Sequence, residues 1–317
     1  MGAITNFDRA TLLLKAESTY GTDSVPVGAT DSILISNGRI RYTANKLVRE
    51  IDQAYLGARP FLLTGRTAFV EFDIEMMGAT TVDLTAPISP VLLILGLAET
   101  ITPSTGPVDY DPISAAFTSA TGYFHIASPN VSGGARHIIT GLRGNAVLNQ
   151  GINGFSRLTC TLQGNEAIVS DNALPVQTLS AFQKPIGITT PNWILSLDGF
   201  LVEGVELSLD LGQNVQLYET SETKCVAITT RDATGFLRIH DPDIVDVDPY
   251  ALAQAEVAVP IVSTVGVGAT KILTTTIGEA LLEFPERIDI DGASGLRVPF
   301  TALPSSAGND DFKFSFS

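Results

Sequence analysis

Apolar and polar residues alternate over residues 205–211, the most regular pattern in the chain. The apolar positions are Val205, Leu207, Leu209 and Leu211, and the polar positions between them are Glu206, Ser208 and Asp210. A period of two residues is typical of a β-strand with one buried face. A polar connection follows, and the chain returns through residues 225–240, where Asp232 and Gly235 predict a turn. Residues 199–240 therefore predict a meander of paired strands, and they contain no catalytic constellation.

A second alternating segment covers residues 68–78. In this segment Phe69 and Glu71 face away from Val70 and Phe72, which again predicts a strand with one buried face.

The remaining strand predictions rest on turn signals and β-rich composition. Residues 33–44 predict two strands around Asn37 and Gly38, because Asn-Gly is the preferred two-residue hairpin turn. Runs bounded by Gly, Pro or Asn predict further strands at 121–128, 136–151, 154–164, 269–277, 279–291, 295–302 and 311–317.

Two short helices are predicted where a capping residue precedes a proline, at Ser89-Pro90 and at Asp248-Pro249. A serine or aspartate oxygen can accept from a free backbone N–H at the N-cap, and proline suits the first helical position. The two helix starts are 159 residues apart (248 − 89), which is nearly half of the 317-residue chain. The closing strands that begin at residues 158 and 312 are 154 apart (312 − 158). Matching order at a matching distance predicts two related β-rich lobes.

The predicted fold is therefore mostly β, with two related lobes that each have one short flanking α-helix. Residues 1–30 are expected to form an N-terminal arm, 31–172 the first lobe, 173–192 a proline-rich linker, and 193–317 the second lobe.

The composition is rich in apolar and poor in charged residues. Hydrophobic residues make up 44% of the chain and charged residues 17%, with a mean hydropathy of +0.25. This excess can supply either a larger core or an interface between subunits, and we favour the interface. The longest apolar run, residues 90–98, is about half of what a transmembrane helix needs, and no signal peptide is recognised, so we expect a soluble chain with no membrane partner. The two cysteines, Cys160 and Cys225, are expected to be reduced thiols.

The net charge of −15 argues against ordinary nucleic-acid binding, which needs Lys and Arg to displace counterions from phosphates. Two interpretations remain open. The charge can keep the protein soluble, or it can line a conduit through which a polyanion slides without binding.

No motif predicts an enzyme, a cofactor or a metal site. His125, His137 and His240 are isolated in strand patterns, without zinc-ligand spacing. The acidic run from Asp241 to Asp248 lacks the glycine and glutamate of a calcium loop. Ser221 to Lys224 matches the SxxK pattern of serine acyl-enzymes without the companion motifs. We expect structural roles for all of these residues.

Several segments together resemble the major tail tube proteins of long-tailed, siphovirus-like bacteriophages. The segments are LLLKAESTYGTDSVPVGATDSILISN at 12–37, VELSLDLGQNVQLYET at 205–220, RDATGFLRI at 231–239 and PFTALPSSAGNDDFKFSFS at 299–317. The resemblance implies a β-sandwich or barrel-like fold whose sheets join edge to edge in rings. It further implies that the rings stack into a hollow tail tube in the virion, that the tube is assembled in the host cytoplasm, and that genomic DNA passes through it without specific binding.

The resemblance also implies partners. The chain itself is the main partner, with three copies per ring favoured over six because each chain is predicted to have two lobes. Tail terminator, distal tail and tape measure proteins are the others. The alternative function is a carbohydrate- or receptor-binding β-sandwich on a virion or cell surface, although Trp193 is the only tryptophan that could stack on a sugar.

Family members bridge subunits and rings by extended loops and terminal arms, which leads to three candidate contact regions. They are the N-terminal arm, the loop from residue 45 to 65 and the connection from 212 to 224. The candidate contact residues are Leu12, Leu13, Leu14, Arg49, Arg59, Arg66, Gln216, Tyr218 and Lys224, and the candidate lumen-facing acids are Glu206 and Asp210.

Overall fold

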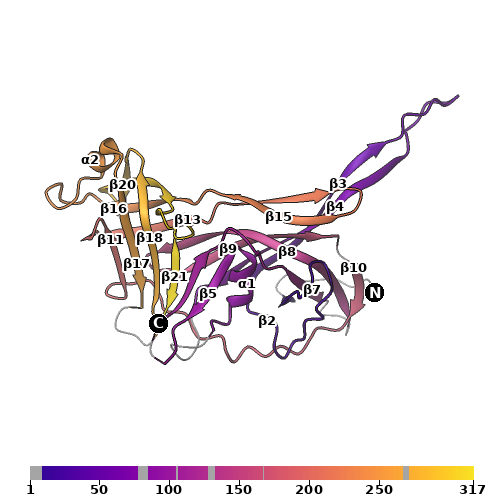
Figure 1. Cartoon of the computed structure of the whole chain (residues 1–317), viewed down its shortest axis with the longest axis horizontal. Coiled ribbons are helices and arrows are strands. Elements are labelled where there is room, and N and C mark those ends of the chain that lie inside the picture. Colours follow the sequence, from indigo (N-terminus) through magenta and orange to yellow (C-terminus); the bar gives the residue numbers. More distant parts are fainter. Residues whose placement is uncertain (1–8, 78–84, 105, 128–132, 167, 267–270) are drawn as a thin grey trace.

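The computed structural model describes residues 9–77, 85–104, 106–127, 133–166, 168–266 and 271–317. The fold is mostly β with two short helices in these residues, which confirms the predicted fold class. Figure 1 shows two groups of strands side by side, long strands that run between them, and a hairpin that projects beyond the rest of the molecule.

Eleven elements precede residue 173 in the described part of the chain. They are β1 (Ala10–Ala16), β2 (Ser32–Ile33), β3 (Ser36–Val48), β4 (Phe61–Glu75), α1 (Ser89–Ile94), β5 (Leu97–Ile101), β6 (Val108–Pro112), β7 (Ala120–Ala127), β8 (Gly134–Gly151), β9 (Arg157–Asn165) and β10 (Ile168–Asn172).

The later elements begin at residue 193. They are β11 (Trp193–Leu197), β12 (Phe200–Leu201), β13 (Gly204–Asp210), β14 (Gln213–Glu219), β15 (Lys224–Arg231), β16 (Thr234–His240), α2 (Pro249–Ala255), β17 (Ala258–Val265), β18 (Leu273–Leu282), β19 (Glu286–Ile290), β20 (Ala293–Leu303) and β21 (Lys313–Phe316).

Eight antiparallel strands of the largest sheet follow one another as two sets of four. The first set has the order β3-β4-β9-β8, and the second set has the order β13-β16-β20-β19. In the first set, β4 of the β3–β4 hairpin pairs with β9 of the β8–β9 hairpin, and α1 lies between these hairpins along the chain. In the second set, β16 pairs in the same way with β20, and α2 lies between the two hairpins. The sets meet where β8 pairs with β13, from Val147 opposite Asp210 to Gly151 opposite Glu206. We call this junction the seam.

Strand β8 belongs to two layers. Its first part pairs with β7 and β10, and its second part pairs with β9 and β13. Gly141 lies where the partners change; its φ is +66°, and a Cβ there would meet Tyr20 Oη at 2.5 Å. The layer continues from β7 through β1 to β2. Side chains of both layers and of α1, such as Leu14, Phe72 and Leu92, are buried in one core.

The second group of strands is built around β17 and β18. β11 and β12 extend the sheet beyond β17, while β18 pairs with the end of β20 and with β21. β21 in turn pairs with β6, and β6 with β5, so strands from the first half of the chain complete this group. Core residues of both groups, such as Leu148 and Phe300, belong to one hydrophobic cluster.

Both predicted helix starts are confirmed, but only one has the predicted cap. Asp248 accepts hydrogen bonds from the backbone N–H groups of Tyr250 and Ala251, and Pro249 occupies the first turn of α2. In α1 the N-cap is Ile88, and Ser89 instead donates its hydroxyl to Glu99 at 2.8 Å. The serine is therefore used for a tertiary contact with β5.

Two turn predictions are wrong. Asn37 and Gly38 lie inside β3 at a register shift opposite β4, where the φ of +55° at Asn37 forms a bulge instead of a hairpin turn. Asp232 lies between β15 and β16, which continue in one direction, and its N–H donates to Gly212 O across the hairpin. The break at Asp232 is therefore a kink in a long hairpin, not a reversal of the chain.

The predicted polar connection at 212–224 is also mostly strand. Gln213–Glu219 forms β14, which pairs with β15, and the reversal is confined to the residues between them. Polar composition here reflects exposure of the hairpin rather than a loop conformation.

The N-terminal region departs from the predicted arm. Residues 1–8 lie outside the described residues, and the segment that follows is β1, which pairs with β2 and β7. Leu12, Leu13 and Leu14 are buried in the core of the chain, so none of them is exposed for contact with another copy. The predicted boundaries at residues 31, 173 and 193 remain predictions.

Candidate interaction surfaces

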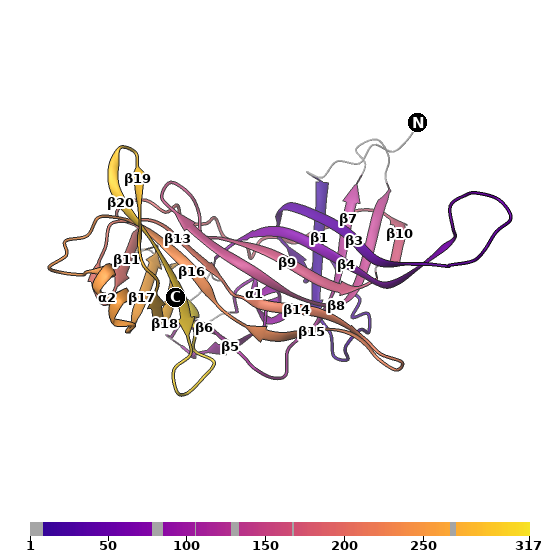
Figure 2. The ribbon, with the colours of Figure 1, turned by 90° about the horizontal axis from the view of Figure 1, so that it is seen from above.

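The most prominent surface is the distal half of the β3–β4 hairpin, residues 45–64, which we call the arm. Figures 1 and 2 show it extending away from every other strand to one end of the molecule. Its strands pair with each other from Asn45 opposite Thr64 to Val48 opposite Phe61. Leu47 and Leu62 are 57% and 56% exposed, although isolated apolar strands of this length are normally packed on a core.

The charge of the arm differs from that of the whole chain. The three cations Lys46, Arg49 and Arg59 outnumber the two acids Glu50 and Asp52, and all five are exposed. Lys46 lies over the Phe61 ring at 4.4 Å. Among the described residues, neither Arg49 nor Arg59 belongs to an ion pair. The two candidate contact residues on the arm are thus free for a partner.

A second hairpin, β14–β15, has the opposite arrangement and lies against its own chain. We call it the inner hairpin. It contacts β8 and β9, and Val226 on it is fully buried. Arg143 on β8 donates to Val226 O at 2.8 Å, and Val226 N–H donates to Tyr20 Oη at 2.6 Å.

The inner hairpin also connects two predicted contact residues. Lys224 Nζ donates to Arg66 O at 2.6 Å, while the Arg66 guanidinium pairs with Glu166 at 2.9 Å. Both cations are therefore used within the chain, in contrast to Arg49 and Arg59. Gln216 and Tyr218 are exposed on the hairpin, and Gln216 bonds Asn214 at 2.8 Å.

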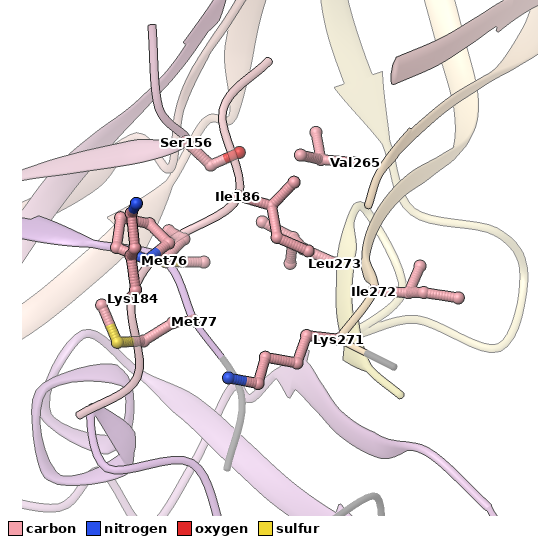
Figure 3. Close-up of a pocket in the computed structure, with 10 residues that line it drawn as sticks. Met76, Met77, Ser156, Lys184, Ile186, Val265, Lys271, Ile272 and Leu273 are labelled. Carbon is pink, nitrogen blue, oxygen red and sulfur yellow. The ribbon is translucent and has the colours of Figure 1, made fainter. Parts of the chain in front are cut away.

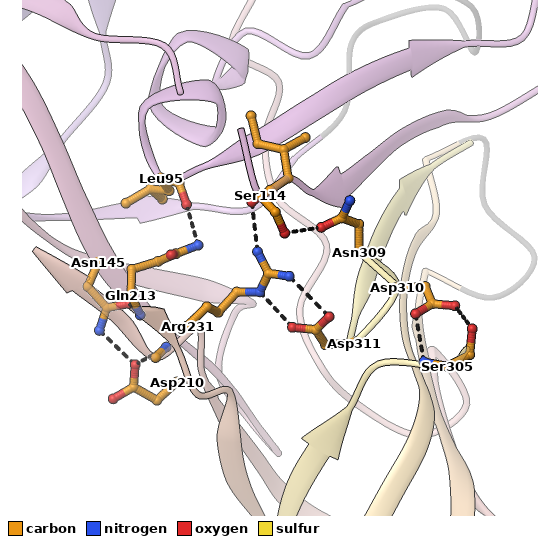
Figure 4. A network of polar contacts seen from close by, with 12 residues as sticks. Leu95, Ser114, Asn145, Asp210, Gln213, Arg231, Ser305, Asn309, Asp310 and Asp311 are labelled. Atoms are coloured by element: carbon orange, nitrogen blue, oxygen red, sulfur yellow. Dashed lines mark hydrogen bonds and ion pairs between the residues drawn. The ribbon is translucent and has the colours of Figure 1, made fainter. Parts of the chain in front are cut away.

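The base of the inner hairpin is fixed by a polar network (Figure 4). Gln213 donates to Leu95 O, just after α1, at 2.9 Å. Arg231 forms a bidentate pair with Asp311 at 2.6 and 3.2 Å and donates to Ile113 O at 2.8 Å. Arg231 and Asp311 are both largely buried, so this pair ties the hairpin to the loop before β21.

The hairpin base rests on four residues of the first half, which we call the first platform: Leu95, Gly96, Ile113 and Phe117. A Cβ at Gly96 would lie 3.0 Å from Gln213, 3.2 Å from Phe117 and 3.4 Å from Ile228. A cavity of about 240 Å³ remains between the platform and the hairpin. This is smaller than the ~300–1,000 Å³ typical of a ligand site.

The candidate lumen-facing acids lie on the polar face of the eight-strand sheet. Glu206 and Asp210 share this face with Ser208, opposite buried Leu207 and Leu209. Glu206 pairs with Arg238 at 3.1 Å, and Asp210 accepts from Asn145 at 2.7 Å.

Other carboxylates of this sheet are paired in the same manner. The pairs are Arg41 with Glu71, Arg157 with Asp73, and Arg297 with Glu286. Positive and negative groups alternate on the sheet, so Glu206 and Asp210 are not part of a uniformly acidic wall. Whether this face meets a pore remains a prediction.

His125, one of the three histidines in the sequence, lies in the core. His125 is 4% exposed, and neither ring nitrogen has a hydrogen-bond partner. Burial, together with Arg136 and His137, lowers the pKa of His125 to about 4. The ring is therefore neutral at physiological pH and packs as a core residue.

The other candidate groups differ in burial. Burial raises the pKa of the Cys160 thiol. Trp193 is half-buried, and its indole N–H donates to Ser263 at 2.9 Å. No group of three or more His, Cys, Asp or Glu residues within the described ranges could hold a metal ion. Neither helix that the structure describes is long and apolar enough to cross a membrane.

A cavity between the two groups of strands is shown in Figure 3. Met76, Met77 and Ser156 line it on one side, and Val265 and Leu273 on the other. Its volume is about 30 Å³, enough for a water molecule and too small for a substrate.

Sequence patterning did not single out three features of these surfaces. They are the outer edges of β3 and β19, which have no partner strand among the described residues, the exposed apolar residues of the arm, and the residues that follow α2. Their sequence signal is limited to short apolar runs, such as residues 47–48 and 61–63, and to single residues such as Phe284. Exposed apolar residues of this kind are common on any protein. Comparison with known proteins adds no assignment, because neither a protein-family model nor a curated protein matches the chain.

Proposed function

We propose that this chain is a structural virion protein that self-assembles into stacked rings, forming a tail tube through which DNA leaves the capsid. The carrying observation is the repeat of strand order in the eight-strand sheet. The seam joins the last strand of one set, β8, to the first strand of the next, β13. A ring requires the same kind of junction between chains.

The two strands that would form this junction between chains are open. Within the described residues, β3 pairs only with β4, and β19 pairs only with β20. β8 and β19 are the last strands of the two sets, and β3 and β13 are the first. β19 is five residues long, the same length as the stretch of β8 that pairs in the seam. A second copy that places β3 on β19 therefore extends the sheet as the seam does.

Open strand edges favour self-association, since each exposes a row of unpaired backbone N–H and C=O groups. Repeating one heterologous junction produces a closed ring when the rotation closes and a filament when it does not. Three chains would supply six four-strand sets to a ring. The mixture of paired charges on the polar sheet face suits a conduit that neither traps nor strongly repels DNA.

The test is a proline scan of β19. Successive backbone N–H groups of a strand point alternately to its two sides. Of two neighbouring residues, Ile288 and Asp289, one therefore donates toward β20 and the other points to the open edge. Of the variants Ile288→Pro and Asp289→Pro, the one at the open-edge position removes an N–H from that edge and leaves the hydrogen bonds to β20 intact. That variant should stay folded and fail to form the rings that the wild type shows by negative-stain microscopy. Asp289→Pro also removes the acceptor of the Gly292 N–H at 3.1 Å, so a small loss of melting temperature is expected for it. A wild type that stays monomeric at all concentrations, or rings that survive both substitutions, would contradict the proposal.

A further inference from the structure

We infer that the arm of one chain docks on a second copy, at the residues that follow α2 and β18. The partner surface consists of Glu256, Val257, Glu283 and Phe284, which we call the second platform. This inference rests on the proposed self-assembly and specifies a contact within it.

The second platform corresponds in position to the first. Two residues, Leu95 and Gly96, separate α1 from β5, and two residues, Glu256 and Val257, separate α2 from β17. A residue with positive φ lies in each link, at Gly96 (+77°) and at Glu256 (+52°).

The strands that follow the helices are paired alike. Leu97 at the start of β5 lies opposite Pro112 at the end of β6, and Ala258 at the start of β17 lies opposite Leu281 near the end of β18. The residues after β6 and β18 therefore lie next to the helix ends in both halves of the chain.

The two platforms differ in what covers them. The inner hairpin covers the first platform through Gln213, Ile228 and Arg231. On the second platform, Val257 is 51% exposed and Phe284 is 67% exposed. A surface that a hairpin covers in one half of the chain is thus left uncovered in the other.

The arm has the same place in the first set as the inner hairpin has in the second set. Unlike the inner hairpin, it does not pack on another part of its own chain. The inner hairpin extends the β13–β16 pair of the second set over the first set, and the arm extends the β3–β4 pair of the first set beyond the molecule. If β3 continues the sheet at the β19 edge of another copy, the arm projects over the second set of that copy. The second platform belongs to the same half of the chain.

Charge complementarity supports this occupant. The arm carries Lys46, Arg49 and Arg59 together with Glu50 and Asp52, so its net charge is +1 (3 − 2) in a chain with a net charge of −15. Glu256 and Glu283 on the second platform are exposed, and neither belongs to an ion pair among the residues described. Figure 2 shows the arm and α2 at opposite ends of the molecule, so the contact has to form between copies, head to tail.

The first test places a charge in each apolar surface. Leu62→Asp and Phe284→Asp should each raise the protein concentration for half-assembly at least about tenfold by sedimentation velocity, because each buries a carboxylate in the contact. Val176→Asp is the matched control, since Val176 is 89% exposed and lies on neither surface. All three variants should keep the melting temperature of the monomer.

The second test reverses charges and needs no apolar substitution. Arg49→Glu with Arg59→Glu should weaken assembly, and so should Glu256→Lys with Glu283→Lys, whereas all four changes in one chain should restore it. If the wild type assembles and the variants assemble equally well, or the fourfold variant shows no rescue, the arm contact is refuted while ring formation stands. A wild type that does not assemble refutes the proposed function itself.

Discussion

At the scale of single residues, the buried ion pair between Arg231 and Asp311 connects three segments that are distant in sequence. The guanidinium bonds Asp311 in the loop before β21 and Ile113 after β6, while the residue itself ends β15. Charged groups with this little exposure are held only when each hydrogen-bonding site has a partner. The pair therefore fixes where the inner hairpin leaves the sheet.

Removal of one member of this pair should be costly. We expect Asp311→Asn to lower the free energy of unfolding by about 3–5 kcal/mol, because the Arg231 charge is left buried without its counterion. Urea denaturation followed by circular dichroism measures the loss. Asp241→Asn is the control: it breaks the exposed pair with Arg287 and should cost less than about 1 kcal/mol. Equal losses of unfolding free energy in the two variants would show that burial of the ion pair does not determine its contribution to stability.

At the scale of elements, the long hairpin from β13 to β16 owes its shape to a kink at Gly212. The backbone of Gly212 has a φ of +66°, and a Cβ on it would lie 1.9 Å from Asp232 O. The kink separates the pairing in the sheet from the pairing in the inner hairpin. Only a glycine fits where the two strands of the hairpin approach each other this closely.

We expect Gly212→Ala to destabilise the chain by about 2 kcal/mol or more, because it combines an unfavourable backbone conformation with a clash. Gly199→Ala is the matched control, since Gly199 has a φ of +79° and a Cβ added to it would meet no atom within 4 Å. Thermal denaturation compares the two variants. The clash argument fails if the two melting temperatures fall by the same amount.

Local patterns predict the elements of this chain better than they predict its connections. Alternation identifies β4 and β13 because each has one buried face, and Asp248-Pro249 identifies α2 because capping is local. Asn37-Gly38 misleads since the same positive φ that suits a hairpin turn also suits a bulge. Burial of Leu12, Leu13 and Leu14 depends on β7, more than a hundred residues away, which no local window contains.

At the scale of the whole molecule, the two four-strand sets make the chain resemble two subunits joined end to end. Three of the candidate contact residues, Leu12, Leu13 and Leu14, are buried in the core, and the sequence does not show how the remaining candidates divide. Arg66 and Lys224 are used inside the chain, and Arg49 and Arg59 remain on the arm. Which of these cations is used within the chain depends on which hairpin packs on its own chain, and this packing is a property of the complete fold.

The repeat predicts the number of chains in a ring. We expect top views of assembled rings to show six similar sectors with threefold symmetry, because each chain supplies two unequal sets. Averaging of electron micrographs without imposed symmetry, together with the mass of a single ring by native mass spectrometry, measures this. A ring of six chains would contradict the proposal that both four-strand sets of each chain occupy equivalent places around the ring axis.

The seam joins β8 and β13 of the same polypeptide. The two strands therefore meet at an effective concentration set by the chain and not by the amount of protein in solution. In a ring built as proposed, every second junction would form during folding of the monomer. Dilution could then open only the alternate junctions, and a ring would come apart into intact two-set units before any four-strand set was separated from its neighbour across the seam.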